Sequence, residues 1–100
     1  MVCHGIDIPK DRIASFCKRH GIRRLALFGS ILHDDFDDES DIDVLVEFHP
    51  EVSVGLRFFA MERELSDILG RTVDLNTPGF LSKYFRDKIL QEAEVQYEAA

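Results

Sequence analysis

Two aspartates, separated by a single residue, begin a segment in which apolar and other residues alternate. Asp41 and Asp43 flank Ile42, and apolar residues recur at every second position through Phe48, which predicts a β-strand. Residues two apart in a strand share a face, about 7 Å apart along the backbone, so both carboxylates would converge. Such oxygen donors bind Mg²⁺ together with substrate phosphates. If only these two acids are considered, an alternative to a metal site is that they are simply solvated at the end of a strand.

A glycine–serine pair follows a short apolar run earlier in the chain. Leu25–Phe28 predicts a buried strand, and Gly29 and Ser30 come directly after it. Backbone N–H groups at such a turn can face an anion, and a serine hydroxyl can donate to phosphate. A simple strand-ending turn would account for the pair if it stood alone.

A third acid, Asp74, lies inside the short apolar segment Val73-Asp74-Leu75. An ionised carboxylate there is costly unless it has a partner or faces water. Asp74 could be an edge-strand or capping acid with no role in chemistry. It could also be a third ligand of a metal site formed with other acids, or receive the proton of an attacking hydroxyl.

Hydrophobic periodicity predicts the elements that would position these residues. Apolar residues at steps of three and four predict helices, and Pro, Gly and Thr mark their ends. The expected order is a helix over 9–20, a strand over 25–28, an acidic loop, a strand over 42–48, a helix over 58–69, a strand over 72–76, and a helix from Thr77-Pro78 to Leu90. This alternation favours an α/β domain with a small sheet covered by helices.

The excess negative charge is concentrated in ten residues. The net charge is −7, and the rest of the chain holds twelve acids and twelve bases. The stretch contains Asp34, Asp35, Asp37, Asp38, Glu39, Asp41 and Asp43. A cluster of this kind needs solvent or cations around it. It argues against direct nucleic-acid binding, which requires a basic face.

Length and composition bound the remaining possibilities. The 100 residues predict one domain over 1–100. There is no apolar run of about 20 residues and no signal-peptide pattern, so we expect no membrane association and a cytoplasmic protein. Cys3 and Cys17 form neither a disulfide framework nor a metal-ligand cluster, and Cys17 falls on an apolar helix face.

Taken together, the three motifs resemble those of the polymerase-beta-like nucleotidyltransferases. Phe28-Gly29-Ser30 is followed, eleven residues after the serine, by Asp41-Ile42-Asp43-Val44-Leu45-Val46, and later by Val73-Asp74-Leu75. The resemblance covers most of the chain. It implies a nucleotidyltransferase fold with a small mixed sheet flanked by helices. It also implies Asp41, Asp43 and Asp74 as catalytic metal ligands for Mg²⁺, two ions with Mn²⁺ as a substitute, and Gly29 and Ser30 as nucleotide-binding residues.

The short chain is similar to the minimal nucleotidyltransferases (MNT proteins), the antitoxins of HEPN/MNT toxin–antitoxin modules. The resemblance implies transfer of AMP from ATP to a HEPN-domain toxin. It also implies that the acceptor surface comes from that partner or from an oligomer. A non-catalytic antitoxin that binds the toxin is the alternative. Transfer to a small molecule, as in aminoglycoside-modifying relatives, would require a substrate domain that this chain lacks.

One segment departs from the family pattern. Many relatives carry an arginine and a glycine shortly after Gly-Ser, whereas this chain has Ile31-Leu32-His33-Asp34. An arginine there could neutralise phosphate charge, and neither isoleucine nor aspartate can do so. The departure leaves metal binding in place and favours the non-catalytic alternative.

Overall fold

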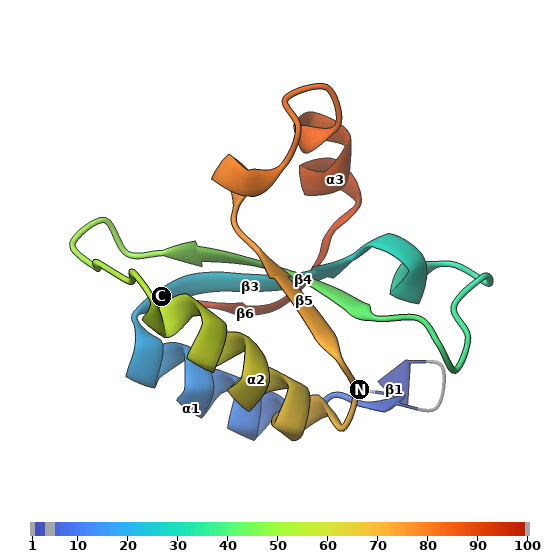
Figure 1. The fold of residues 1–100 in the computed structure, drawn as a ribbon, viewed down its shortest axis with the longest axis horizontal. Helices are drawn as coiled ribbons and strands as arrows, with labels where there is room; N and C mark the ends of the chain where they lie inside the picture. Colours follow the sequence, from blue (N-terminus) through green and yellow to red (C-terminus); the bar gives the residue numbers. More distant parts are fainter. Residues whose placement is uncertain (1, 4–5, 100) are drawn as a thin grey trace.

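The computed structural model describes residues 2–3 and 6–99 and centres on a four-stranded mixed sheet (Figure 1). The strands stand in the order β5-β4-β3-β6. Their bounds are β3 (Ile22–Phe28), β4 (Ile42–Phe48), β5 (Val73–Asn76) and β6 (Glu94–Glu98). β3 pairs antiparallel with both β4 and β6, and β4 pairs parallel with β5. The α/β architecture expected from the sequence is confirmed.

Helices α1 (Lys10–His20) and α2 (Arg57–Leu69) both cover one face of this sheet (Figure 1). Each helix is amphipathic and buries one stripe against the strands. The core includes Ile13, Phe16, Met61 and Leu65 from the helices and Ile42, Val44, Val46, Val73 and Leu75 from the strands. Burying each such side chain contributes about 1.5–3 kcal/mol. Because strand side chains alternate, the residues between these strand positions face away from α1 and α2.

Cys17 belongs to the buried stripe of α1. Burial raises the pKa of its thiol to about 12, so it remains protonated and packs as a small apolar side chain. This agrees with the expectation from the helical pattern.

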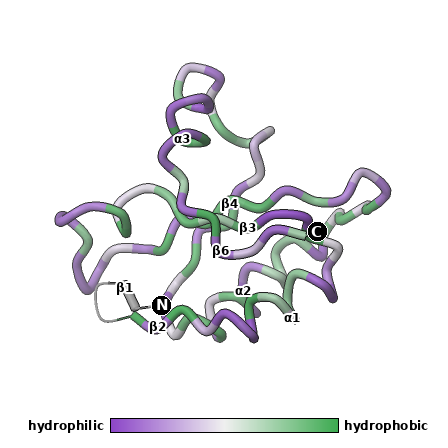
Figure 2. The backbone as a smooth tube through the Cα atoms, turned by 180° about the vertical axis from the view of Figure 1, so that it is seen from behind, coloured by the Kyte–Doolittle hydropathy of each residue, from purple (hydrophilic) through white to green (hydrophobic). Residues whose placement is uncertain are grey.

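Within the described residues, only short helices cover the opposite side of the sheet. The 3₁₀ helix η2 (Pro78–Phe80) and helix α3 (Arg86–Glu92) stand on this side (Figure 1). Hydrophobic and hydrophilic residues are interspersed along this part of the chain (Figure 2). A second 3₁₀ helix, η1 (Gly29–Leu32), follows β3. No helix in residues 2–3 and 6–99 is long and apolar enough to cross a membrane.

The expected continuous helix from Thr77-Pro78 to Leu90 is wrong. Thr77 and Pro78 do open a helix, but it ends at Phe80, and α3 begins only at Arg86. Neither helix buries a residue. Short helices without tertiary packing are marginal in water, so apolar periodicity alone does not make this segment one helix.

Three strands were missed by the sequence patterns. β6 supplies the outer neighbour of β3, and β1 (Val2–Cys3) pairs antiparallel with β2 (Ile6–Asp7). β6 reads Glu-Val-Gln-Tyr-Glu; it alternates Val95 and Tyr97 with polar residues but is short, and it buries Gln96 while Val95 is exposed. Two-residue strands leave no periodicity to detect. β3 also begins earlier than expected, at Ile22, because two arginines interrupt its apolar pattern.

Candidate active site

Two acids lie opposite each other on the parallel strands β4 and β5. Asp43 is in register with Asp74, and the Ile42 amide donates to the Thr72 carbonyl over 2.9 Å. Side chains at paired positions of neighbouring strands point to the same face, about 5 Å apart. Since Ile42, Val44, Val73 and Leu75 pack on the helical side, both carboxylates occupy the face opposite α1 and α2.

Gly29 brings the end of β3 against the same carboxylate. Phe28, the last residue of β3, pairs with Asp43, and Gly29 then turns the chain into η1 with a φ of 76°. A Cβ at Gly29 would collide with Oδ2 of Asp43. The left-handed backbone therefore favours glycine here, and an added Cβ would also force the Asp43 carboxylate to move. Ser30 follows within η1, beside β4 and partly exposed.

Asp43 is the inner member of three interacting acids. Its side chain is partly buried, whereas Asp74 and Asp41, the residue just before β4, are exposed. Burial raises the pKa of Asp43 to about 6, with further contributions from the charges of Asp74 and Asp41 and from a hydrogen bond with Asp74. The structure therefore brings Asp74 and Asp41 within electrostatic reach of Asp43.

The carboxylates suit a hard cation in their chemistry. Three aspartates offer only oxygen donors, the ligand type that Mg²⁺ and Mn²⁺ accept. Burial, followed by the charges of Asp74 and Asp41, raises the pKa of Asp43, and a bound cation would offset this penalty on its ionised form. Within the described ranges, however, no three His, Cys, Asp or Glu side chains form a converged ligand cluster. The donor set fits a divalent metal, and the carboxylates would have to close around it.

Arg71 joins the acidic loop to the start of β5. One of its guanidinium nitrogens donates to the backbone carbonyls of Asp37 and Ser40, the latter over 2.8 Å. The guanidinium also lies 4.7 Å from the centre of the Phe36 ring. Ser40 directly precedes Asp41, so this arginine positions the strand end that bears the outer carboxylate. No feature of the sequence indicated this role, because a single arginine before a strand belongs to no recognisable motif or periodic pattern.

The loop also has its own internal hydrogen bonds. Asp37 accepts from the Glu39 amide over 2.9 Å and from the Ser40 hydroxyl over 3.1 Å. These bonds, the Glu39 amide first, lower the pKa of Asp37. Its charge therefore serves to fold the loop, while Asp34, Asp35 and Asp38 are exposed, as expected for solvated acids.

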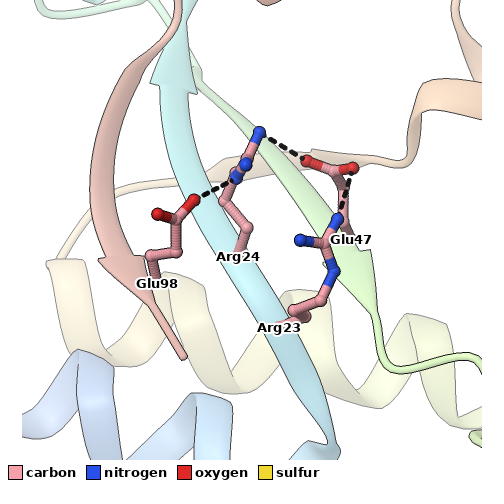
Figure 3. Close-up of polar contacts among 4 residues, drawn as sticks. All are labelled: Arg23, Arg24, Glu47 and Glu98. Atoms are coloured by element: carbon pink, nitrogen blue, oxygen red, sulfur yellow. Dashed lines mark hydrogen bonds and ion pairs between the residues drawn. The ribbon is translucent and has the colours of Figure 1, made fainter. Parts of the chain in front are cut away.

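An ion-pair network occupies the far end of the sheet. Figure 3 shows Arg23 and Arg24 of β3 converging on Glu47 of β4, with Glu98 of β6 on the other side of Arg24. The N–O distances are 3.0 Å for Arg23–Glu47, 3.3 Å for Arg24–Glu47 and 2.7 Å for Arg24–Glu98. Glu47 lies four residues along β4 from Asp43, about 13 Å. These arginines are thus engaged away from the three aspartates.

The departure from the family pattern has a structural counterpart. Ile31, where a basic side chain could have helped with phosphates, is fully buried and belongs to the core. His33 is exposed. In the segment after Ser30, Ile31 therefore packs in the hydrophobic core and does not face the candidate site's solvent.

Comparison with known proteins identifies the family. The profile of the family described as "Nucleotidyltransferase domain" matches residues 10–95. The chain belongs to this family. It is also 36% identical, over 89% of its length and 95% of the relative's, to a Methanocaldococcus jannaschii protein with the provisional name of protein adenylyltransferase. The chain is accordingly a nucleotidyltransferase.

Solved structures agree on the fold. One, described as a minimal nucleotidyltransferase, superposes with a TM-score of 0.70 at 31% identity, covering 84% of this chain and 85% of the other. Another is a Shewanella oneidensis MNT antitoxin in complex with a tri-AMPylated HEPN toxin. Its TM-score is 0.63 at 17% identity, with 90% of this chain and 70% of the other covered, which supports the fold alone.

Proposed function

We propose that this nucleotidyltransferase transfers AMP from ATP to a HEPN-domain protein and acts as the antitoxin of that toxin. The observation that carries the proposal is that the Asp43 carboxylate interacts with both Asp74 and Asp41 and lies against the backbone of Gly29. The provisional name of the M. jannaschii relative and the AMPylated toxin of the S. oneidensis complex support the donor and the acceptor. The cytoplasm, which supplies ATP and keeps a thiol such as Cys17 reduced, is the proposed compartment.

Each residue of the site receives a role under this proposal. Asp41, Asp43 and Asp74 hold the divalent metal, and the Gly29 backbone and the Ser30 hydroxyl bind the triphosphate. When bound, two Mg²⁺ ions, or Mn²⁺ in their place, supply the charge neutralisation that phosphoryl chemistry requires. Asp74 is exposed at the edge strand, and under the proposal it accepts the proton of the incoming hydroxyl.

The transfer forms one bond and breaks another. The acceptor hydroxyl oxygen bonds to the α-phosphorus of ATP, and the bond from that phosphorus to the oxygen bridging the β-phosphate breaks. Pyrophosphate leaves, and the hydroxyl proton passes to Asp74. The chain contributes chiefly by orienting these groups, because positioning is the main protein contribution in phosphoryl-type transfer.

A mass measurement tests this function. The product of the neighbouring gene, which the proposal expects to be a HEPN-domain protein, is incubated with the purified chain, ATP and Mg²⁺. We expect its mass to rise by one or more AMP units with the wild type and with Asp38→Asn, which removes an exposed loop carboxylate. With Asp43→Asn the rate should fall by at least about 100-fold, because the inner ligand is lost. An unmodified partner in the wild-type reaction contradicts adenylylation.

The buried Ile31 favours one alternative, an antitoxin that acts by contact alone. No basic side chain extends from this position toward the phosphates, which would slow turnover without affecting a binding surface. Under this alternative, wild type and Asp43→Asn neutralise the toxin equally and the toxin gains no mass. The same reactions, scored for toxin activity as well as mass, therefore separate the two functions.

A further inference from the structure

β5 has a strand neighbour on one side only. Among the described strands it pairs with β4 alone, and the Thr72 carbonyl just before it accepts from the Ile42 amide of β4. Because consecutive residues of a strand direct their backbone groups to opposite edges, the amides of Val73 and Leu75 are directed away from β4. Both residues are 3% exposed, so amides without a partner there would lose the hydrogen bonds that water provides.

Two side chains of α2 accept the hydrogen bonds of these amides. The Leu75 amide donates to Oε2 of Glu62 over 2.8 Å, and the Val73 amide donates to Oγ of Ser66 over 3.0 Å. Four residues of a helix rise about 6 Å and two residues of a strand about 7 Å, so the two acceptors match the two donors in spacing. α2 therefore occupies the edge of β5 that a further strand would otherwise fill.

Ser66 ties α2, the following turn and β5 together. Its hydroxyl donates to the Glu62 carbonyl over 2.9 Å while it accepts from the Val73 amide, because a hydroxyl can do both at once. Its carbonyl accepts from the amides of Gly70 and Arg71, the latter over 3.1 Å. The turn from α2 into β5 is thus held by hydrogen bonds to a single residue.

Asp74 lies between the two amides that α2 holds. Its exposed side chain belongs to a residue in register with Asp43, and the two side chains share a hydrogen bond. β5 has only four residues, so its pairing with β4 is short. Carboxylates that share a metal must keep their geometry within about 0.5 Å. A short edge strand held on one side alone is poorly suited to that precision.

We propose that Glu62 and Ser66 are positioning residues, which fix the Asp74 carboxylate relative to Asp43 by holding the outer edge of β5. The inference rests on the proposed metal site of the nucleotidyl transfer and adds the contacts from α2 that keep this site in shape. Both residues act through backbone amides of β5, so what the strand requires of them is an oxygen acceptor. Glu62→Gln retains such an oxygen, and Glu62→Ala does not.

Matched variants of the full chain separate positioning from general stability. Glu62→Ala and Ser66→Ala each remove one acceptor, and Glu62→Gln tests rescue by a neutral acceptor. Glu64→Ala is the control, the same change two residues along α2, where the carboxylate pairs with Arg19 and His20 of α1. If Glu62→Ala does not fold by far-ultraviolet circular dichroism, Ser66→Ala against Glu64→Ala carries the test.

The first measurement needs neither metal nor partner. Amide hydrogen exchange is followed by NMR in a chelator. In Glu62→Ala we expect the Leu75 amide to accelerate at least about tenfold more than the amides of β3, because it alone loses its acceptor. In Glu64→Ala, which lowers stability without freeing β5, the Leu75 and β3 amides should accelerate together. Glu62→Gln should restore the wild-type protection of Leu75.

The second measurement is the affinity for Mn²⁺ in the presence of α,β-methylene ATP, an analogue that cannot release pyrophosphate. Electron paramagnetic resonance reports the free Mn²⁺. We expect Glu62→Ala and Ser66→Ala each to weaken Mn²⁺ binding at least about fivefold, because the Asp74 ligand is no longer held in place. Glu62→Gln and Glu64→Ala should stay within about twofold of wild type. Contacts that only stabilise the fold would leave every folded variant with wild-type affinity.

Several results overturn the positioning role. They are wild-type Mn²⁺ affinity in Glu62→Ala, equal weakening in Glu64→Ala, failure of Glu62→Gln to restore binding, and no Mn²⁺ binding by the wild type. The outcome for adenylylation is separate. If Mn²⁺ binding weakens in Glu62→Ala while the wild type transfers no AMP to the product of the neighbouring gene, positioning is supported and adenylylation is rejected.

Discussion

The two regions that meet near β5 are built in opposite ways. The aspartates lie on central and edge strands whose other face is fully packed, with Ile42, Val44, Val73 and Leu75 buried beneath them. The segment from Asn76 to Val95 buries nothing. Ligands that must be held within a fraction of an ångström benefit from a rigid sheet, whereas a segment with no buried residue can change conformation at a lower cost in free energy.

The largest expected effect tests this contrast in packing directly. Leu65→Ala, at a fully buried site of α2, should lower the free energy of unfolding by about 2–5 kcal/mol, because it removes core contacts and leaves a cavity. Leu90→Ala, the same change at a 39% exposed site of α3, should cost less than about 1 kcal/mol. Urea denaturation measures both. Comparable losses would show that α3 is part of the cooperative core.

A second pair of variants separates backbone strain from the contact with Asp43. Gly29 and Gly70 have similar positive φ values, 76° and 68°, but an added Cβ collides with Asp43 at Gly29 and meets nothing within 4 Å at Gly70. Gly70→Ala should cost about 1 kcal/mol and leave nucleotide transfer intact. Gly29→Ala should cost more and reduce transfer by at least about tenfold, measured from AMP incorporated per minute. Equal transfer by the two variants would mean that the close approach is unimportant.

The packed region was largely predictable from the sequence, and the loose one was not. Alternation from Ile42 to Phe48 and the helical steps of α1 and α2 correspond to residues with a core to bury against, so their patterns reflect the structure. In the C-terminal segment, Leu81, Tyr84, Phe85, Ile89 and Leu90 have helical spacing but no surface to pack on. The same pattern there gave a helix that is too long.

The proximity of the candidate residues was predictable from the sequence, whereas the residues that support them were not. Gly29, Asp43 and Asp74 are brought together by strand register, which the order of the motifs already suggested. The role of Arg71 could not be predicted from the sequence, because its guanidinium donates to the backbone carbonyls of residues 37 and 40. Every residue has such a carbonyl, so the sequence does not mark these acceptors. The functional roles of the aspartates remain proposals.

Arg71 gives a third, smaller test of how the carboxylate region is held. Arg71→Ala removes donors to two carbonyls and the contact with Phe36. We expect a loss of about 1–2 kcal/mol in unfolding free energy. The thermal stabilisation by Mg²⁺ and ATP should also fall, because the loop before Asp41 is no longer anchored. Arg63→Ala, an exposed arginine of α2, serves as the control. If both variants retain the full ligand-induced shift, the loop is positioned without Arg71.

The smallest effect concerns the charge at Asp43 in metal-free protein. Its pKa in the folded state is about 6, above the ordinary value of 3.8, so the folded protein binds this proton more tightly than the unfolded chain. Stability from protonated Asp43 is fully present below pH 3.8 and is lost as the pH rises through about 6. Asn mimics the neutral acid and escapes that loss.

Asp43→Asn should therefore be more stable than wild type at pH 7 in a chelator. The gain should be on the order of 1 kcal/mol, below the full value of a two-unit shift because the site is partly exposed. The difference should vanish near pH 4. Excess Mg²⁺ with ATP should reverse it, because only the wild type then gains a ligand. Asp38→Asn, an exposed loop acid, should stay within about 0.5 kcal/mol of wild type throughout. Thermal melts from pH 4 to 8 provide the measurement. A metal-free Asp43→Asn protein less stable than wild type at pH 7 would show that burial and the charges of Asp74 and Asp41 do not penalise the ionised Asp43 carboxylate, which would remove the main electrostatic support for a metal site.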